Sequence, residues 1–212
     1  MKKNLFKSVA FLAVGALSGL VFNSCKGGAS GGGIVDEAIK QVEQTIATEE
    51  TPIFGSLPSL YEQKLEAGTI VGKHFRELKT EDMDEAVKNK SLRDEAEKKL
   101  AEYYKAKIAE ATQALDGKDI KVEFDKSQFS DAKVTLKVSN AERGIFNLAF
   151  DAALAKPVNK EVEFKWVFMD AEGNELQTYS DYITPGEKIN KEWMVTADQH
   201  FAKKFEHLFI KF

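Results

Sequence analysis

The chain has 212 residues, of which 43% are hydrophobic and 30% are charged, and its formal net charge is −4 at pH 7. An acidic chain gains nothing from counterion release on a phosphate backbone, and the sequence has no stripe of Lys and Arg interleaved with aromatic residues. We therefore expect no nucleic-acid partner.

The first 24 residues have the three regions of an export signal. Basic side chains stand at the start, an uncharged apolar run covers 9–22, and Ser24 directly precedes Cys25. The apolar run is shorter than the roughly 20 residues that a membrane-spanning helix needs, so we predict a signal peptide over 1–24 that is cleaved. Cleavage removes three of the 30 basic residues and none of the 34 acidic ones, which leaves a net charge of −7. The mature part, 188 residues long, suits one medium-sized or two small domains.

The segment 20–25 resembles the lipobox of Gram-negative bacterial lipoproteins, which signal peptidase II cleaves. Ser24 is the small residue before the modified cysteine, while Phe22 and Asn23 depart from the tightest form of the pattern. The resemblance implies a diacylglycerol thioether and an N-acyl chain on Cys25, and no other cofactor. Two or more acyl chains hold a protein stably at a bilayer, so the membrane is the first expected partner.

The alternative interpretation of Cys25 is an ordinary buried or free thiol. Because it is the only cysteine, no intrachain disulfide can form, and stability has to come from the core. By resemblance to the sorting rule of Gram-negative lipoproteins, Lys26 in place of Asp implies the outer membrane rather than the inner one. No acidic cluster follows the cysteine, which favours an orientation toward the periplasm over display on the cell surface.

A glycine-rich stretch follows the cysteine and reads KGGASGGG over 26–33. It has no side chains able to build a core, so we predict that 25–33 is a lipidated, flexible tether. No predicted strand precedes these glycines and no Lys-Ser or Lys-Thr follows them, which excludes a nucleotide-binding loop.

Helical periodicity dominates 34–118. Apolar residues at helical spacing predict a short helix over 34–47, and a loop containing Pro52, Gly55 and Pro58 precedes a second helix that ends near Leu78. The second helix contains Gly68 and Gly72, whose missing side chains would allow close approach of a neighbouring helix.

A third helix is predicted from Glu81 to Asp116, after Thr80 as its N-cap. Its apolar residues recur mostly at steps of four, and it is either one long rod or two helices that break near 89–91. The region is therefore predicted to be a helical hairpin of two to three helices.

After Asp119 the hydrophobic period changes to two, which indicates strands. Seven strands are predicted within 119–212, at 120–124, 134–138, 146–154, 162–168, 175–183, 189–196 and 205–212. The predicted fold class is α+β, with the helical hairpin followed by an antiparallel β-sandwich. This half resembles immunoglobulin-like and fibronectin-III-like sandwiches in its spacing of short strands and in the Asp170/Gly173 hairpin followed by Pro185-Gly186. The resemblance implies the shape of the domain and no function.

Catalytic and metal-binding patterns are absent from the sequence. There is no Gly-x-Ser-x-Gly elbow, and His74, His200 and His207 do not have the spacing of metal ligands. Three carboxylates are candidates for acid–base chemistry but stand near predicted turns, where Asp usually binds its own backbone, namely Asp170, Asp181 and Glu187. We expect no catalytic residue, no metal and no further cofactor.

Aromatic residues are the remaining candidates for a binding surface. Tyr179, Tyr182 and Trp193 flank the predicted turn at 185–186, and rings on one surface would form a platform for a sugar or a protein partner. The alternative interpretation places Trp193 and Trp166 in the core of the sandwich.

Three functions are compatible with these patterns. The leading hypothesis is a non-enzymatic envelope lipoprotein that serves as an interaction or assembly module, with an envelope protein or a glycan as partner. The second is a carbohydrate-binding accessory or a glycan hydrolase with paired acids. The third is a structural spacer built on the long helix.

Overall fold

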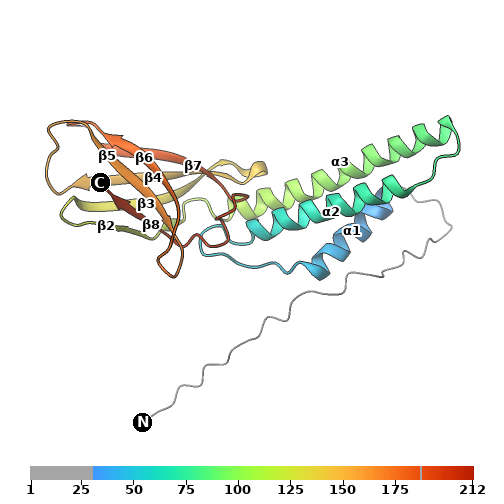
Figure 1. The fold of residues 1–212 in the computed structure, drawn as a ribbon, viewed down its shortest axis with the longest axis horizontal. Coiled ribbons are helices and arrows are strands. Elements are labelled where there is room, and N and C mark those ends of the chain that lie inside the picture. Colours follow the sequence, from blue (N-terminus) through green and yellow to red (C-terminus); the bar gives the residue numbers. More distant parts are fainter. Residues whose placement is uncertain (1–30, 187) are drawn as a thin grey trace, which may run out of the picture.

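The computed structural model describes residues 31–186 and 188–212, and it shows an elongated molecule with helices at one end and sheets at the other (Figure 1). The fold is α+β, with three helices followed by two sheets, as the change of period predicts. The predicted signal peptide, Cys25, residues 26–30 and Glu187 lie outside the described residues.

The helices are α1 (Gly31–Thr45), α2 (Leu57–Glu77) and α3 (Met83–Gln113). Helix α3 is continuous over its 31 residues and is about 46 Å long, so the chain has no break at 89–91. Its N-cap is Asp82 rather than the predicted Thr80, because the Asp82 carboxylate accepts a hydrogen bond from the Glu85 backbone N–H at 2.9 Å. Helix α1 begins three residues before the predicted start.

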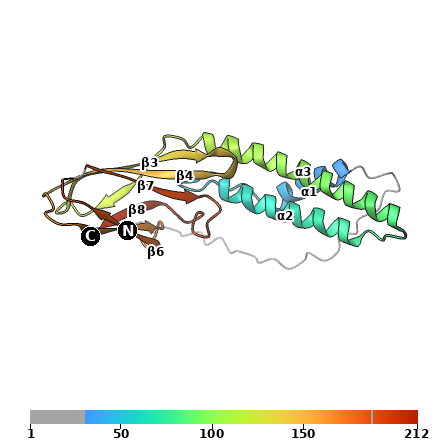
Figure 2. The ribbon, with the colours of Figure 1, turned by 90° about the horizontal axis from the view of Figure 1, so that it is seen from above.

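Helices α2 and α3 form an antiparallel hairpin, and α1 packs against both (Figures 1 and 2). Side chains that recur every three or four residues fill the space between the helices; among the buried ones on α2 and α3 are Leu60, Gln63, Ala67, Val71, Ala96, Leu100, Tyr104 and Ile108. Helix α1 runs parallel to α3, since Lys99 pairs with Asp36 at 2.8 Å and Lys107 pairs with Glu43 at 2.7 Å.

Eight strands form two four-stranded sheets of order β1-β3-β4-β7 and β2-β8-β5-β6. Their bounds are β1 (Asp119–Ile120), β2 (Val122–Phe124), β3 (Phe129–Asn140), β4 (Ile145–Leu154), β5 (Val162–Met169), β6 (Glu175–Ile183), β7 (Ile189–Thr196) and β8 (His207–Lys211), with a 3-10 turn η1 (Ala141–Arg143) before β4. All pairs are antiparallel except β2 with β8.

The strand predicted at 120–124 is two strands, which corrects the predicted number from about seven to eight. The chain changes sheets at Lys121: Ile120 pairs with Val134 in the first sheet, whereas Val122 pairs with Leu208 in the second. Alternation of apolar residues continues through the change, so the hydrophobic pattern alone does not reveal it.

The two sheets pack face to face around aromatic rings. Phe150 on β4 contacts Trp166 on β5, with ring centroids 5.1 Å apart, and also Phe164 at 5.8 Å. Trp166 is fully buried, in agreement with its interpretation as a core residue.

The loop between α1 and α2 joins the helices to the sheets. Phe54 is fully buried, and its ring lies 5.7 Å from Phe146 on β4 and 6.0 Å from Phe205. The Lys118 ammonium donates to the backbone oxygen of Pro52 at 2.7 Å, which holds the same loop in place. The hydrophobic core is therefore continuous from the helices to the sheets.

Candidate binding groove on the helical hairpin

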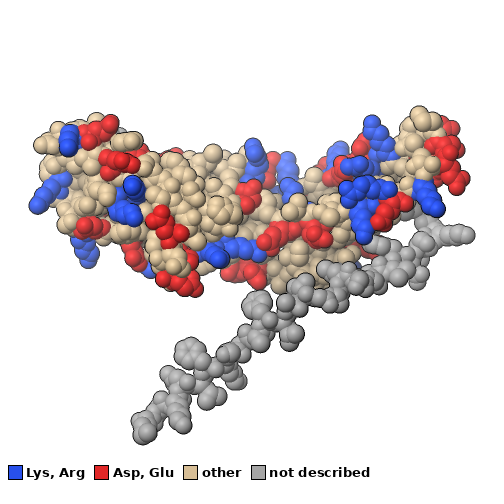
Figure 3. Space-filling view, in the orientation of Figure 1, with Lys and Arg blue, Asp and Glu red and all other residues tan. Residues whose placement is uncertain are grey.

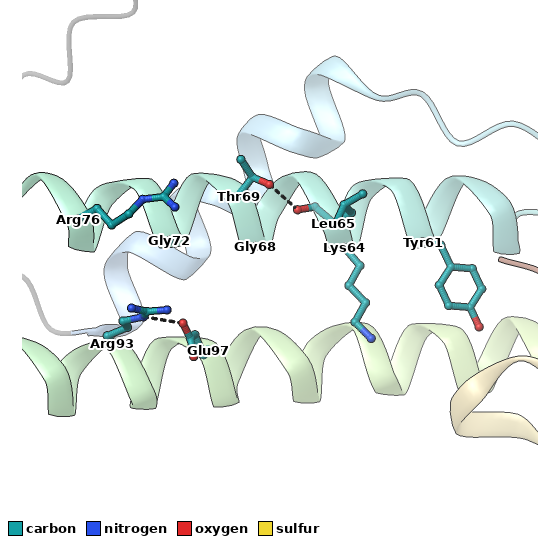
Figure 4. Close-up of a pocket in the computed structure, with 9 residues that line it drawn as sticks. All are labelled: Tyr61, Lys64, Leu65, Gly68, Thr69, Gly72, Arg76, Arg93 and Glu97. Atoms are coloured by element: carbon teal, nitrogen blue, oxygen red, sulfur yellow. Dashed lines mark hydrogen bonds and ion pairs between the residues drawn. The ribbon is translucent and has the colours of Figure 1, made fainter. Parts of the chain in front are cut away.

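A groove of about 680 Å³ runs along α2 on the side where it faces α3 (Figure 4). It extends from Tyr61 to Arg76, a length of about 22 Å along the helix. The residues that line it are Tyr61, Lys64, Leu65, Gly68, Thr69, Gly72 and Arg76 on α2, and Arg93 and Glu97 on α3.

The groove lies on the opposite side of the hairpin from α1. On α3, Lys99 and Lys107 pair with α1 and lie on one side of the buried residues of that helix. Arg93 and Glu97, which line the groove, lie on the other side of those buried residues. Because α1 covers only one side, the other side of the hairpin is uncovered by the described chain.

The floor of the groove is apolar and open. Leu65 is 74% exposed, although the sequence pattern groups it with the apolar residues of its helix. Gly68 and Gly72 follow it along the groove, and a Cβ atom built on either glycine meets nothing within 4 Å. The described chain thus places no helix against these glycines, and the close approach that they allow is available to another molecule.

The rim of the groove is basic, in contrast to the acidic chain as a whole. Three cations and one carboxylate line it, which is a net charge of +2. The carboxylate, Glu97, is already paired with Arg93 at 2.7 Å. Lys64 and Arg76 form no ion pair within the described part of the chain, and Figure 4 shows Lys64 extending from α2 toward α3.

A second hollow, of about 290 Å³, continues the groove to the junction with the sheets and shares Tyr61 and Leu65 with it. It reaches the segment between β7 and β8, where Lys203 pairs with Glu62 at 2.7 Å. Its other residues are Pro58, Ala197, Asp198, Gln199 and His200.

Tyr61 connects the groove to the sheet end of the molecule. Its hydroxyl donates to the backbone oxygen of Arg143 at 2.9 Å, directly beside Gly144. Burial raises the pKa of Tyr61 to about 12, and the charge of Asp198 adds to this effect. The phenol is therefore neutral at physiological pH and acts as a hydrogen-bond donor.

Two polar side chains of the groove have partners within the groove. The Thr69 hydroxyl donates to the Leu65 backbone oxygen at 3.1 Å, and the Glu97 carboxylate is held by Arg93. Among the lining residues, no hydroxyl or amine is hydrogen-bonded to a histidine or carboxylate that would act as its base.

The predicted aromatic platform is divided between two faces. The rings of Tyr179 and Trp193 are in tilted contact with centroids 4.5 Å apart, and both are half-buried against the core between the edge strands β6 and β7. Tyr182, three residues after Tyr179 on β6, is on the opposite face, where it pairs with Glu163. The three rings therefore do not share one surface, and Trp193 packs beside the core but is not enclosed by it.

The polar residues singled out from the sequence have structural contacts. Asp170 accepts hydrogen bonds from two backbone N–H groups and the Asn174 side chain, which confirms its role in the β5–β6 turn. Asp181 accepts from the Tyr182 backbone N–H at 2.7 Å. The three histidines occupy separate places, His74 against Phe75, His200 against Phe201, and His207 buried near Glu123.

The described residues contain no metal-binding cluster and no membrane-spanning helix. Within 31–186 and 188–212, no three residues among His, Cys, Asp and Glu gather as a metal site would require. None of the helices in the same ranges combines the length and apolar character that crossing a bilayer requires.

Comparison with known proteins gives no match: no protein-family model, no curated protein and no solved structure is similar to the chain.

The sequence singled out Gly68 and Gly72 for the close approach of a neighbouring helix, which is wrong for the described chain, because a Cβ on either glycine meets nothing within 4 Å there. Gly68 and Gly72 are conspicuous because glycine weakens a helix interior and requires a reason to be there. The hydrophobic pattern does not show which side of the hairpin α1 covers. It therefore predicts neither the exposure of Leu65 nor the lack of ion pairs at Lys64 and Arg76 within the described residues.

Proposed function

We propose that the chain is a non-enzymatic lipoprotein of the cell envelope, anchored by acyl chains on Cys25, that binds a partner protein in the groove between α2 and α3. The observation that carries this proposal is the open floor formed by Leu65, Gly68 and Gly72 under a basic rim. The outer membrane, with the protein facing the periplasm, is the proposed location, supported by Lys26 after the cysteine.

The partner segment that fits this groove is an acidic amphipathic α-helix. A helix of about 15 residues matches the length of the groove. Glycines on the floor allow its backbone to approach closely, while Leu65 offers an apolar contact. Carboxylates on such a helix would pair with Lys64 and Arg76, the two cations of the rim that have no partner in the described chain.

Photo-crosslinking in intact cells tests the groove. A photoreactive residue at position 65 is expected to capture a protein whose crosslinked segment is acidic and helical, whereas the same residue at the exposed Met194 on the sheets captures none. A Cβ atom at position 68 meets nothing within 4 Å in the folded chain, and Gly68→Leu, which places a bulky side chain on the floor, is expected to abolish the product from position 65. Equal capture from position 194, or capture that Gly68→Leu leaves unchanged, would contradict a binding role for the groove.

Mass spectrometry of the N-terminal peptide tests the anchor separately. The purified protein is expected to begin at Cys25 with a diacylglycerol thioether and an N-acyl chain, and Cys25→Ala is expected to release the protein from membranes. A chain that begins at Met1 with a free thiol would rule the anchor out.

An immunoglobulin-like relationship of the sheets is also part of this proposal. Strands β3, β4 and β7 adjoin in the order of strands A, B and E of that fold, and β5 and β8 in the order of C and F. In this assignment β6 is strand C′, and β2 takes the place of strand G but runs parallel to its neighbour. The assignment concerns shape and adds no activity.

A further inference from the structure

Exposed apolar side chains gather where α2 turns into α3. Leu78, Met83 and Val87 are 37%, 78% and 65% exposed, and they lie within ten residues of one another. They make up half of the six large hydrophobic residues that are exposed in the described chain; the other three are Leu65, Tyr182 and Met194. We call the segment 77–90 the hairpin tip.

The hairpin tip extends beyond α1. The first turn of α1 is level with the middle of α3, where the Lys99 ammonium donates to the Gly32 backbone oxygen at 3.3 Å. Met83 precedes Lys99 by 16 residues, a distance of about 24 Å along α3. Helix α1 therefore does not extend as far as the hairpin tip, as Figure 1 shows.

The segment between Cys25 and α1 has enough residues to reach the level of the tip. Because α1 is parallel to α3, its N-terminus points toward the tip and away from the sheets. Gly31 is six positions after Cys25, and a fully extended chain over six residue steps spans about 20 Å. This reach is close to the distance by which the tip extends beyond the start of α1.

From this geometry we infer that the hairpin tip rests on the phospholipid surface in which Cys25 is anchored, with Leu78, Met83 and Val87 in contact with lipid. The inference depends on the lipid anchor of the proposed function. In this orientation α3 begins at the membrane and points away from it, so that the sheets are the part of the protein farthest from the membrane. The groove then lies between the membrane and the sheets.

The charge of the tip determines which lipid headgroups are compatible with the contact. Five acidic residues and three lysines lie within 77–90, a net charge of −2. In Figure 3 both signs are mixed at this end of the molecule. Such a surface is repelled by anionic headgroups and tolerated by zwitterionic ones, so the expected surface is zwitterionic.

Two matched tryptophan variants test the contact. Met83→Trp places the probe at the tip, and Met194→Trp places it on β7, the exposed methionine of the sheets. The full protein, isolated with its native lipid, is bound to phosphatidylcholine vesicles with brominated acyl chains, which quench tryptophan on contact. The emission of the unsubstituted protein is subtracted from that of each variant. On binding to the vesicles, the remaining emission of the tip probe is expected to fall to about half, as for a side chain in the lipid interface, while that of the sheet probe is unchanged.

The outcomes separate the tip from the anchor. If the protein floats with the vesicles but both probes are quenched alike or not at all, the tip contact is wrong while the anchor stands. If the protein does not float, the anchor is wrong, and the tip contact is wrong with it. Stronger quenching on vesicles rich in phosphatidylglycerol would overturn the assignment to a zwitterionic surface.

Discussion

Asp170 shows how one side chain sets a turn in this protein. Hydrogen bonds from Asn174, chiefly from its side-chain amide, and from the Glu172 backbone hold the pKa of the Asp170 carboxyl below its ordinary value. A carboxyl whose pKa is lower in the folded state stabilises the fold above its unfolded pKa, and this stabilisation is lost as the pH falls through the folded value.

Asp170→Asn is therefore expected to destabilise the protein at neutral pH, and the difference from the unsubstituted protein should shrink on acidification to about pH 2. Urea unfolding at a series of pH values measures this difference in the free energy of unfolding. Asp131→Asn serves as the control, because Asp131 is exposed and accepts no hydrogen bond in the described chain. A difference that is independent of pH would show that the charge of Asp170 does not matter.

Tyr61 is the second residue with a distinct titration. Because its pKa is raised to about 12 in the folded state, its contribution to stability is complete below the ordinary tyrosine value and is lost as the pH rises through about 12. Tyr61→Phe should remove one late-ionising phenol from the ultraviolet titration. It should also cost about 0.5–1.5 kcal/mol through the lost bond to Arg143. An unchanged titration curve would contradict the burial of this hydroxyl.

At the scale of elements, the same residue type has opposite roles in two places. Gly68 stands in the interior of α2 with open space around it, whereas Gly144 ends η1 with φ of +53°. A Cβ atom on Gly144 would lie 2.3 Å from the Tyr61 hydroxyl oxygen. The first glycine weakens its helix and leaves the groove open, while the second is required by the backbone.

Gly68→Ala is thus expected to stabilise the protein by about 0.5–1 kcal/mol through helix propensity. Gly144→Ala should destabilise it by at least about 1–2 kcal/mol, because alanine disfavours this backbone conformation and displaces Tyr61. Urea denaturation of both variants gives the comparison. Loss of stability in Gly68→Ala would mean that the groove is packed more closely than the structure describes.

At the scale of the whole molecule, the helices and sheets share one core through Phe54. Its ring contacts residues from two separate parts of the β region, so it couples the two ends of the protein. Both tryptophans belong to the sheets, Trp166 to β5 and Trp193 to β7. Tryptophan fluorescence therefore follows the sheets, while far-ultraviolet circular dichroism follows mainly the helices.

Phe54→Ala is expected to cost about 3–5 kcal/mol by leaving a cavity at the junction. In the unsubstituted protein the two signals should change together during unfolding, whereas in the variant they should separate. Leu65→Ala, at an exposed position, should change stability by about 0.5 kcal/mol or less. Coincident transitions in Phe54→Ala would show that another contact couples the two ends.

Local periodicity in the sequence was sufficient to predict the fold class, the order of helices before strands, the turn at Asp170 and the burial of Trp166. These features depend on side chains that are close in sequence and share one face of an element. The change of sheets at Lys121 and the separation of Tyr182 from Tyr179 and Trp193 depend on which strands pair, and alternation does not encode the partner. The groove and the hairpin tip depend on how far α1 covers the hairpin, which only the packing of the three helices decides.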